Sequence, residues 1–261
     1  MNTELLYPNA LAIFLLMSLL WIWSVIRKDA SIVDPWWSIS FLIVTVQSSL
    51  RSGLTPAKGL LLGMVGLWAL RLWGHLLLRS RGKPEDPRYT AFRERFGRER
   101  YWWVSFFQVF LLQGTLAFFI SAPLQLAASQ DTPNPITVTD LVGFLVFVIG
   151  FAFEAIGDWQ LEQFRKTRTS REQVLNTGLW RYTRHPNYFG ETVLWWGFWI
   201  TCLDAPYGWL TFPAPALMTF LLLRVSGVSL LDAHLTNTKP QYAEYIRTTS
   251  AFFPKAPKAS A

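Results

Sequence analysis

Long apolar stretches recur along the whole chain, and they constrain its fold more than any other feature. A helix that crosses a membrane needs roughly 17–25 mostly apolar residues. Stretches of this kind lie near 9–26, 35–51, 58–78, 104–127, 138–157, 188–203 and 207–228. They lack the alternation of transmembrane β-strands, and only 16% of the residues are charged, against about 25% in soluble proteins. We therefore expect an all-α polytopic membrane protein with seven transmembrane helices.

The distribution of Lys and Arg between the connections predicts the orientation. Cytoplasmic connections of membrane proteins carry an excess of these residues. The connections after the third and fifth apolar stretches and the C-terminal tail are basic, whereas 128–137 and 204–206 contain no Lys or Arg. This pattern places the N-terminus outside and the C-terminus in the cytoplasm. The first stretch follows Glu4 rather than a basic leader, so we expect a retained helix and not a cleaved signal peptide.

The chain has no internal repeat and no long linker, so we expect a single membrane domain over 1–261. Its only cysteine, Cys202, excludes an internal disulfide and a cysteine-based zinc cluster. The histidines lack the spacing of metal ligands, and no metal site is expected. Residues 88–100 are basic with aromatic residues at helical spacing, which predicts a helix on the membrane surface. The alternative is a solvated linker that is attracted to anionic lipid.

Charged residues within the apolar stretches form a second informative group, because a charge inside a membrane is costly. Arg71 lies in the third stretch, and Glu154 and Asp158 lie four residues apart, on one face of the fifth. One interpretation is that these acids pair with Arg71 or Arg165 and only lock helices together. The other is that they line a polar cavity that opens to the cytoplasm, with Asp158 and Arg165 contacting a nucleotide.

The segment 178–191 carries most of the chemistry, since it gathers two Arg, one His, two Tyr, one Asn and one Glu at the start of an apolar stretch. The basic segment 165–171 just before it suits a polyanionic cofactor. His185 precedes Pro186, which predicts a bend followed by a helix, and a purely structural turn is the alternative. The chain has neither a Gly-x-Gly-x-x-Gly nor a Walker motif, so a nucleotide would be held in another way.

Three segments resemble the steroid 5-alpha-reductase and sterol reductase family, most closely its uncharacterised bacterial branch: 154–191, the tail 239–245 with 252–254, and Arg71 with the basic turn after it. The resemblance implies a seven-helix enzyme of the bacterial inner membrane that holds NADPH on its cytoplasmic side, mainly through 154–191 and 224–254. It implies reduction of a carbon–carbon double bond conjugated to a carbonyl in a hydrophobic substrate taken from the lipid bilayer. A nucleic-acid partner is not expected.

The resemblance also implies roles for individual residues. The expected cofactor-binding residues are Arg71, Asp158, Arg165, Tyr182, Arg184, His185, Asn187, Glu191 and Tyr242. Glu154 is expected to be catalytic. The family's Gln-Glu pair is missing from the second stretch, and Trp68 stands where the family has a tyrosine. Asp34 is the nearest acidic residue, and beside Trp36 and Trp37 it is expected to act as a protonated acid. The alternative for Asp34 is capping of the helix that follows.

Two other functions compete with the reductase. The segment 184–188 also resembles the S-adenosylmethionine motif of isoprenylcysteine and phospholipid methyltransferases, which share a related fold. The many basic residues favour NADPH, because it carries several phosphates and S-adenosylmethionine carries none. A non-enzymatic lipid-binding or assembly protein with an inactive cofactor site is the third alternative.

Overall fold

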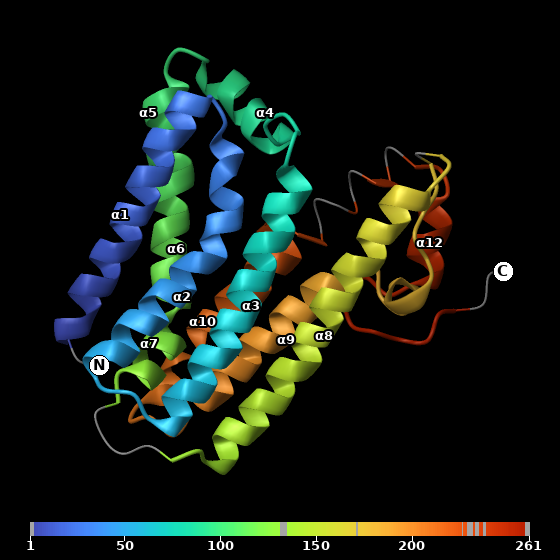
Figure 1. The fold of residues 1–261 in the computed structure, drawn as a ribbon. Coiled ribbons are helices and arrows are strands. Elements are labelled where there is room, and N and C mark those ends of the chain that lie inside the picture. Colours follow the sequence, from blue (N-terminus) through green and yellow to red (C-terminus); the bar gives the residue numbers. More distant parts are fainter. Residues whose placement is uncertain are drawn as a thin grey trace. The chain divides into compact units, whose positions relative to one another are not determined.

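The computed structural model describes residues 3–130, 135–170, 172–225, 227–228, 232, 235–236 and 239–258. The described residues form helices and connections, with no β-strand among them, so the all-α prediction is confirmed (Figure 1). They group into two compact units, Met1–Thr137 with Cys202–Ala214 and Val138–Thr201 with Pro215–Ala261. Each unit is described by itself. The expectation of a single domain stays a prediction.

The first unit contains most of the long helices. Its elements are α1 (Thr3–Arg27), η1 (Ala30–Ile32), α2 (Val33–Arg51), α3 (Pro56–Ser80), α4 (Pro87–Phe96), α5 (Tyr101–Ser105), the π-helical turn η2 (Phe106–Leu111), α6 (Leu112–Ile120), α7 (Ala122–Ala128) and η4 (Gly208–Thr211). The apolar stretch expected at 104–127 is therefore not one regular helix. It changes pitch at η2 and is interrupted after Ile120, where Pro123 in the first turn of α7 supplies no backbone N–H.

Local sequence explains where the helices of the first unit begin and end. Thr55 caps α3 by accepting a hydrogen bond from the Lys58 N–H, and proline occupies the first helical position. Asp86 caps α4 in the same way, and α4 ends at Gly97, whose φ of 89° favours glycine. The helix expected within 88–100 is thus confirmed, although Tyr89 on its first turn is buried and not on the surface.

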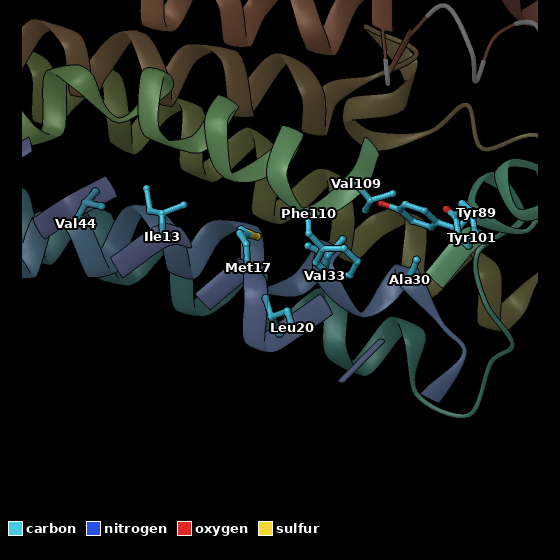
Figure 2. Packing of buried hydrophobic residues seen from close by; sticks show 10 residues of the cluster. All are labelled: Ile13, Met17, Leu20, Ala30, Val33, Val44, Tyr89, Tyr101, Val109 and Phe110. Atoms are coloured by element: carbon cyan, nitrogen blue, oxygen red, sulfur yellow. The ribbon is translucent and has the colours of Figure 1, made fainter. Parts of the chain in front are cut away.

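The core of the first unit lies between α1, α2, and the helices around η2. Figure 2 shows Met17 of α1, Val33 of α2 and Phe110 of η2 packed together, with Tyr89 and Tyr101 at one end of the cluster. A second buried contact joins α2 to α3, where the rings of Phe41 and Trp68 lie 5.7 Å apart. Burial of such large side chains holds the helices of this unit together.

Lys58 belongs to one of the connections expected outside the cytoplasm, and its side chain is buried at 1% exposure. Its ammonium donates hydrogen bonds to the carbonyl oxygens of Ser52 and Gly53, at 3.1 and 2.7 Å. These carbonyls follow the end of α2, where a cation is favourable. Local structure therefore explains Lys58. Because its side chain is buried, it does not count as a surface charge of this connection.

The second unit is built on two helices in close contact, α8 (Val138–Thr167) and α9 (Pro186–Thr201), which lie side by side in Figure 1. Glycines recur every seven residues on α8 at Gly143, Gly150 and Gly157, and they face α9. A Cβ added at Gly150 would lie 2.4 Å from the backbone N of Leu194. The two backbones thus approach more closely than side chains would allow, as small residues permit between membrane helices.

Shorter elements complete the second unit. They are η3 (Gly178–Arg181), α10 (Pro213–Phe220), which starts at the boundary between the units, the π-helical turn η5 (Leu221–Val225) and α12 (Tyr242–Thr248). α8 is ten residues longer than the apolar stretch expected at 138–157, because its polar end continues to Thr167. Much of the tail between 226 and 238, within the cofactor region expected at 224–254, lies outside the described residues.

Five helical segments are long and apolar enough to cross a membrane, so the chain is an integral membrane protein by these criteria. They are Leu6–Arg27, Pro56–Ser80, Tyr101–Ile120, Val138–Thr167 and Gly208–Val225. The other two expected spans form the helices α2 and α9. Buried Ser and Thr lower the hydropathy of α2, and the 16 residues of α9 extend for only about 24 Å at 1.5 Å per residue.

Candidate functional site

The motif of residues 178–191 folds as a turn, a bend and the start of α9. The turn η3 places Trp180 against α8, where its indole N–H donates to the carbonyl oxygen of Gly157 at 3.0 Å. Gly178 precedes it with a φ of 61°, and an added Cβ there would meet the Gln160 side chain at 2.3 Å. The chain then bends at His185, and α9 begins at Pro186 as the sequence predicts.

Three residues of this region converge on one carboxylate, that of Asp232. Arg184 donates to Asp232 at 2.7 Å, and the His185 Nε2 lies 3.0 Å from its other oxygen. The Tyr242 hydroxyl donates to Asp232 at 2.5 Å. Although burial opposes it, the hydrogen bonds from His185, Arg184 and Tyr242 hold the pKa of Asp232 well below its usual range. We call these four residues the Asp232 cluster.

The Asp232 cluster also ties the C-terminal tail to the start of α9. The second terminal nitrogen of Arg184 donates to the carbonyl oxygens of Thr249 and Ile246, at 2.6 and 3.3 Å. The Tyr245 hydroxyl of α12 donates to the carbonyl oxygen of Trp180. Both terminal nitrogens of the Arg184 guanidinium thus donate to protein acceptors, and the side chain is only 9% exposed.

The predicted acidic residues of α8 and α9 are buried within the second unit. Glu154, Asp158 and Glu191 are 3%, 8% and 7% exposed. Asp158 accepts a hydrogen bond from the Asn187 side-chain amide at 3.0 Å, and Glu191 accepts one from the Trp195 indole at 3.1 Å. The carbonyl oxygen of the Asn187 amide is buried and has no hydrogen-bond donor within the described part of the chain. Such an orphaned acceptor suits a ligand N–H or O–H.

Cations gather where α8 ends. Lys239 of the tail donates to the Gln173 carbonyl oxygen at 2.5 Å. Burial lowers the pKa of the Lys239 ammonium, and the positive charges of Arg168 and Arg165 lower it further. Like charges in this arrangement repel one another, and a bound anion relieves that repulsion. We call Arg165, Arg168 and Lys239 the cation cluster.

Two predicted cofactor residues belong neither to the Asp232 cluster nor to the cation cluster. Tyr182 belongs to the same bend, but its side chain is 44% exposed. Arg71 lies on α3 and therefore belongs to the first unit.

Asp34 lies in the first unit, in the first turn of α2. One of its oxygens accepts a hydrogen bond from the Tyr89 hydroxyl at 2.5 Å, and the other pairs with Arg88 at 3.0 Å. The Gln113 amide donates to the same Tyr89 hydroxyl at 3.2 Å. Burial and the charge of Asp34 raise the pKa of Tyr89 well above its usual value. These four residues form the Asp34 cluster.

The contacts of Asp34 decide between the two interpretations of its position. The cap of α2 is Ile32, which makes no side-chain bond, and the Asp34 oxygens bond to side chains of α4. Helix capping is therefore not the role of Asp34. Burial raises the pKa of Asp34, which agrees in direction with the predicted protonated acid, although Arg88 and Tyr89 both donate to its oxygens. Its catalytic role stays a prediction.

Sequence analysis missed several residues of these clusters. Asp232 follows the last apolar stretch and was not among the predicted residues. Arg88 and Lys239 were noted only as parts of the basic segment 88–100 and of the tail. The seven-residue spacing of glycine on α8 is visible in the sequence and was not used, although it is a signal of the close helix contact that the structure shows. No local signal connects Asp34 with Tyr89, because 55 residues separate them.

Comparisons with known proteins place the chain in a family without assigning an activity. It is 22% identical over 279 residues to a Schizosaccharomyces pombe protein described as "Uncharacterized protein C594.04c", with 97% of this chain and 81% of the relative covered. No solved structure matches the chain significantly. A family model described as "Protein of unknown function (DUF1295)" matches residues 20–249, which is most of the chain. The chain therefore belongs to the DUF1295 family.

Proposed function

We propose that this protein is an NADPH-dependent reductase of the inner membrane of a bacterium. Its substrate would be a hydrophobic steroid-, sterol- or isoprenoid-like compound with a carbon–carbon double bond conjugated to a carbonyl. The observation that carries the proposal is the cation cluster beside the motif of residues 178–191. The charges of the exposed residues Arg165 and Arg168 act on the ammonium of Lys239, and such a group of positive charges favours a ligand with several phosphates.

The residues of the second unit fit NADPH in two further respects. The orphaned carbonyl oxygen of Asn187 would accept a hydrogen bond from an amide or hydroxyl of the cofactor, and Asp158 holds the Asn187 amide in place. Glu154, Glu191 and Tyr182 complete the proposed set of neighbouring groups. When bound, NADPH would supply the hydride for the reduction.

Arg184, His185 and Tyr242 have a different part in this proposal. Because the Arg184 guanidinium bonds to Asp232 and to two tail carbonyls, it positions the tail and the bend before α9. His185 and Tyr242 bond to the same carboxylate. We assign all three as positioning residues, which keep Lys239 and Asn187 in a fixed arrangement.

In the first unit, the Asp34 cluster would handle the substrate carbonyl. The Tyr89 hydroxyl donates to Asp34, and burial raises the pKa of both groups. Asp34 and Tyr89 together would supply the proton that the substrate carbonyl receives. The indole N–H groups of Trp36 and Trp73 are buried without an acceptor in the described residues, and their rings lie 5.8 Å apart. They would donate to a substrate oxygen.

For the membrane topology we propose seven spans, with α2 and α9 crossing as part of the helix bundle. The N-terminus would lie outside and the C-terminus in the cytoplasm, which places both the tail and α4 on the cytoplasmic side. The basic residues of α4, of the end of α8 and of the tail support this orientation. Arg71 on α3 stays a proposed cofactor contact.

A direct binding experiment tests the proposed function. Calorimetry on detergent-purified protein should detect NADPH binding, and Lys239→Ala combined with Arg168→Ala should weaken it by about tenfold or more, since each substitution removes a charge-assisted contact. Lys255→Ala is the matched control, because this exposed lysine uses only its backbone N–H, in a bond to the Tyr182 carbonyl. Equal NADPH affinity in both variants would contradict the proposed site.

One observation favours a methyltransferase as the second candidate. The second unit buries Glu154, Asp158 and Glu191, whereas Arg184 is its only buried cation among the described residues. Buried carboxylates suit the sulfonium and ammonium groups of S-adenosylmethionine. The same calorimetry with S-adenosylmethionine distinguishes the two functions. Binding of S-adenosylmethionine without binding of NADPH would reverse the assignment.

A further inference from the structure

A cavity of about 610 Å³ lies in the first unit, where α1 ends beside α4 and α5. Figure 1 shows α4 and α5 at the end of the unit that the C-terminal end of α1 also reaches. The cavity is lined by Lys28, Arg93 and Arg98, by the aromatic residues Tyr101 and Trp102, and by the small or apolar residues Ser24, Val25, Ala30 and Ser105. No carboxylate lines it. The charged residues of the lining are therefore all basic, and none of the lining residues belongs to the Asp34 cluster of the same unit.

The basic residues of the cavity are not equivalent. Arg93 is anchored, because it pairs with Glu85 at 2.7 Å and lies over the Tyr101 ring at 4.6 Å. Arg98 is 77% exposed, and its contact with Glu94 is long at 3.7 Å. Lys28 forms no ion pair within the described part of the chain. Lys28 and Arg98 thus supply the positive charge that an anionic ligand would meet.

The backbone of Lys28 gives an independent indication that its side chain has a function. Lys28 has a φ of 55°, in the left-handed region that glycine adopts without strain. It ends α1 in the usual manner of a helix end, with its N–H bonded to the Val25 carbonyl oxygen and the Asp29 N–H bonded to that of Ser24. Glycine would serve this turn better, so the lysine is explained by its charge and not by its backbone.

The surface next to the cavity is apolar. Trp102 is 54% exposed and lies against Trp21, whose indole N–H donates to the Trp102 carbonyl oxygen at 2.7 Å. Val25, which lines the cavity, and Ile26 beside it are exposed as well. Exposed tryptophan between apolar helix surface and basic residues is typical of the membrane interface. A lipid would fit this arrangement, with its acyl chain along the apolar surface of α1 and its charged headgroup in the cavity.

The Tyr101 hydroxyl provides one more polar group. Tyr101 is 1% exposed, and its hydroxyl has no hydrogen-bond partner in the described residues. We propose that this cavity binds the phosphate headgroup of an anionic membrane lipid, with Lys28 and Arg98 as the charged contacts. Basic residues at the membrane surface each add to the affinity for anionic lipid, and a cavity confines the headgroup between them.

A lipid titration tests this proposal with a readout other than turnover. We expect detergent-purified full-length protein to bind phosphatidylglycerol about tenfold or more tightly than phosphatidylcholine, and Lys28→Gly combined with Arg98→Ala to abolish this preference. Lys83→Ala combined with Arg95→Ala is the control, because it removes the same charge outside the cavity lining. This control should keep the preference.

The variants also separate binding from folding. Lys28→Gly relieves the left-handed strain, so its Tm should equal or exceed that of the wild type. Arg98→Ala alone changes an exposed side chain and should weaken lipid binding with an unchanged Tm. If both double variants lost the preference for phosphatidylglycerol equally, the proposal would be overturned, because the charge of the whole surface would then explain the binding. Inorganic phosphate that binds as tightly as phosphatidylglycerol would overturn the lipid as the source of the phosphate. Neither result affects the proposed NADPH site.

Discussion

The Asp34 and Asp232 clusters use the same three kinds of side chain in different surroundings. In each, an aspartate accepts a hydrogen bond from a tyrosine at 2.5 Å and pairs with an arginine. The arginine differs, because the Arg88 side chain is 52% exposed and that of Arg184 only 9%. Arg184 also bonds to tail carbonyls, whereas Arg88 bonds to Asp86 of its own helix start.

This difference separates a structural cluster from an adaptable one. A buried arginine that loses its partner stays in a medium where water cannot solvate it, so the Asp232 cluster holds the tail in place. A half-exposed arginine is solvated with or without its partner. The Asp34 cluster therefore contributes less to stability and is free to respond to a substrate.

The largest effect is expected for Asp232→Asn. This change leaves Arg184 buried without a counter-charge, and breaking such a pair costs about 3–5 kcal/mol. Thermal unfolding in detergent should show a large drop in Tm, and limited proteolysis should cut the released tail after 239. If the Tm changes no more than in Asp34→Asn, the two clusters are equivalent and the comparison fails.

The next effect concerns the packing that supports the second cluster. Gly150→Ala would place a Cβ 2.4 Å from the backbone N of Leu194, so α8 and α9 must separate. Overpacking of this kind costs about 1–3 kcal/mol or more. Gly63→Ala on α3 is the matched control, since no atom lies within 4 Å of its added Cβ. The control should be neutral or stabilising, and similar Tm values for both variants would refute the close-contact account.

A smaller change in stability is expected for Asp34→Asn. Asparagine still accepts the Tyr89 hydrogen bond, and loss of the pair with the half-exposed Arg88 costs about 1 kcal/mol or less. Turnover of an enone substrate should be abolished, because asparagine carries no acidic proton, while NADPH affinity is retained. Full activity in this variant would remove Asp34 from the proposed mechanism and leave its cluster without a function.

The smallest effect is a pH dependence. The pKa of Asp232 is lowered from its ordinary value of 3.8 in the folded protein, so the unfolded state binds more protons in acid. Its contribution is complete above that value and is lost as the pH falls below it. The Tm difference between wild type and Asp232→Asn should be constant near about pH 6 and shrink near about pH 3. If the Tm difference were the same at both pH values, the Asp232 carboxylate would be excluded as the titrating group.

Much of the fold was predictable because it depends on local pattern. The starts of α3 and α9, the helix α4 and the bend at His185 follow from proline, capping residues and apolar periodicity. Span lengths were less predictable, since the interruption after Ile120 and the polar extension of α8 depend on surrounding structure. Within the proposed site, the sequence grouped Arg184, His185 and Tyr242, which the structure brings together, but not the Asp232 carboxylate that they share. Their binding of a cofactor stays a prediction.

Composition and periodicity alone determined that this chain forms apolar helices in a membrane, because hydrocarbon admits only segments that satisfy their own backbone hydrogen bonds. Tertiary structure alone decided which charges meet. Asp34 with Tyr89 and Arg184 with Asp232 are pairs separated by 55 and 48 residues, and such contacts depend on how helices pack. Buried charges require partners, but the sequence does not state which partner the packing will bring within reach.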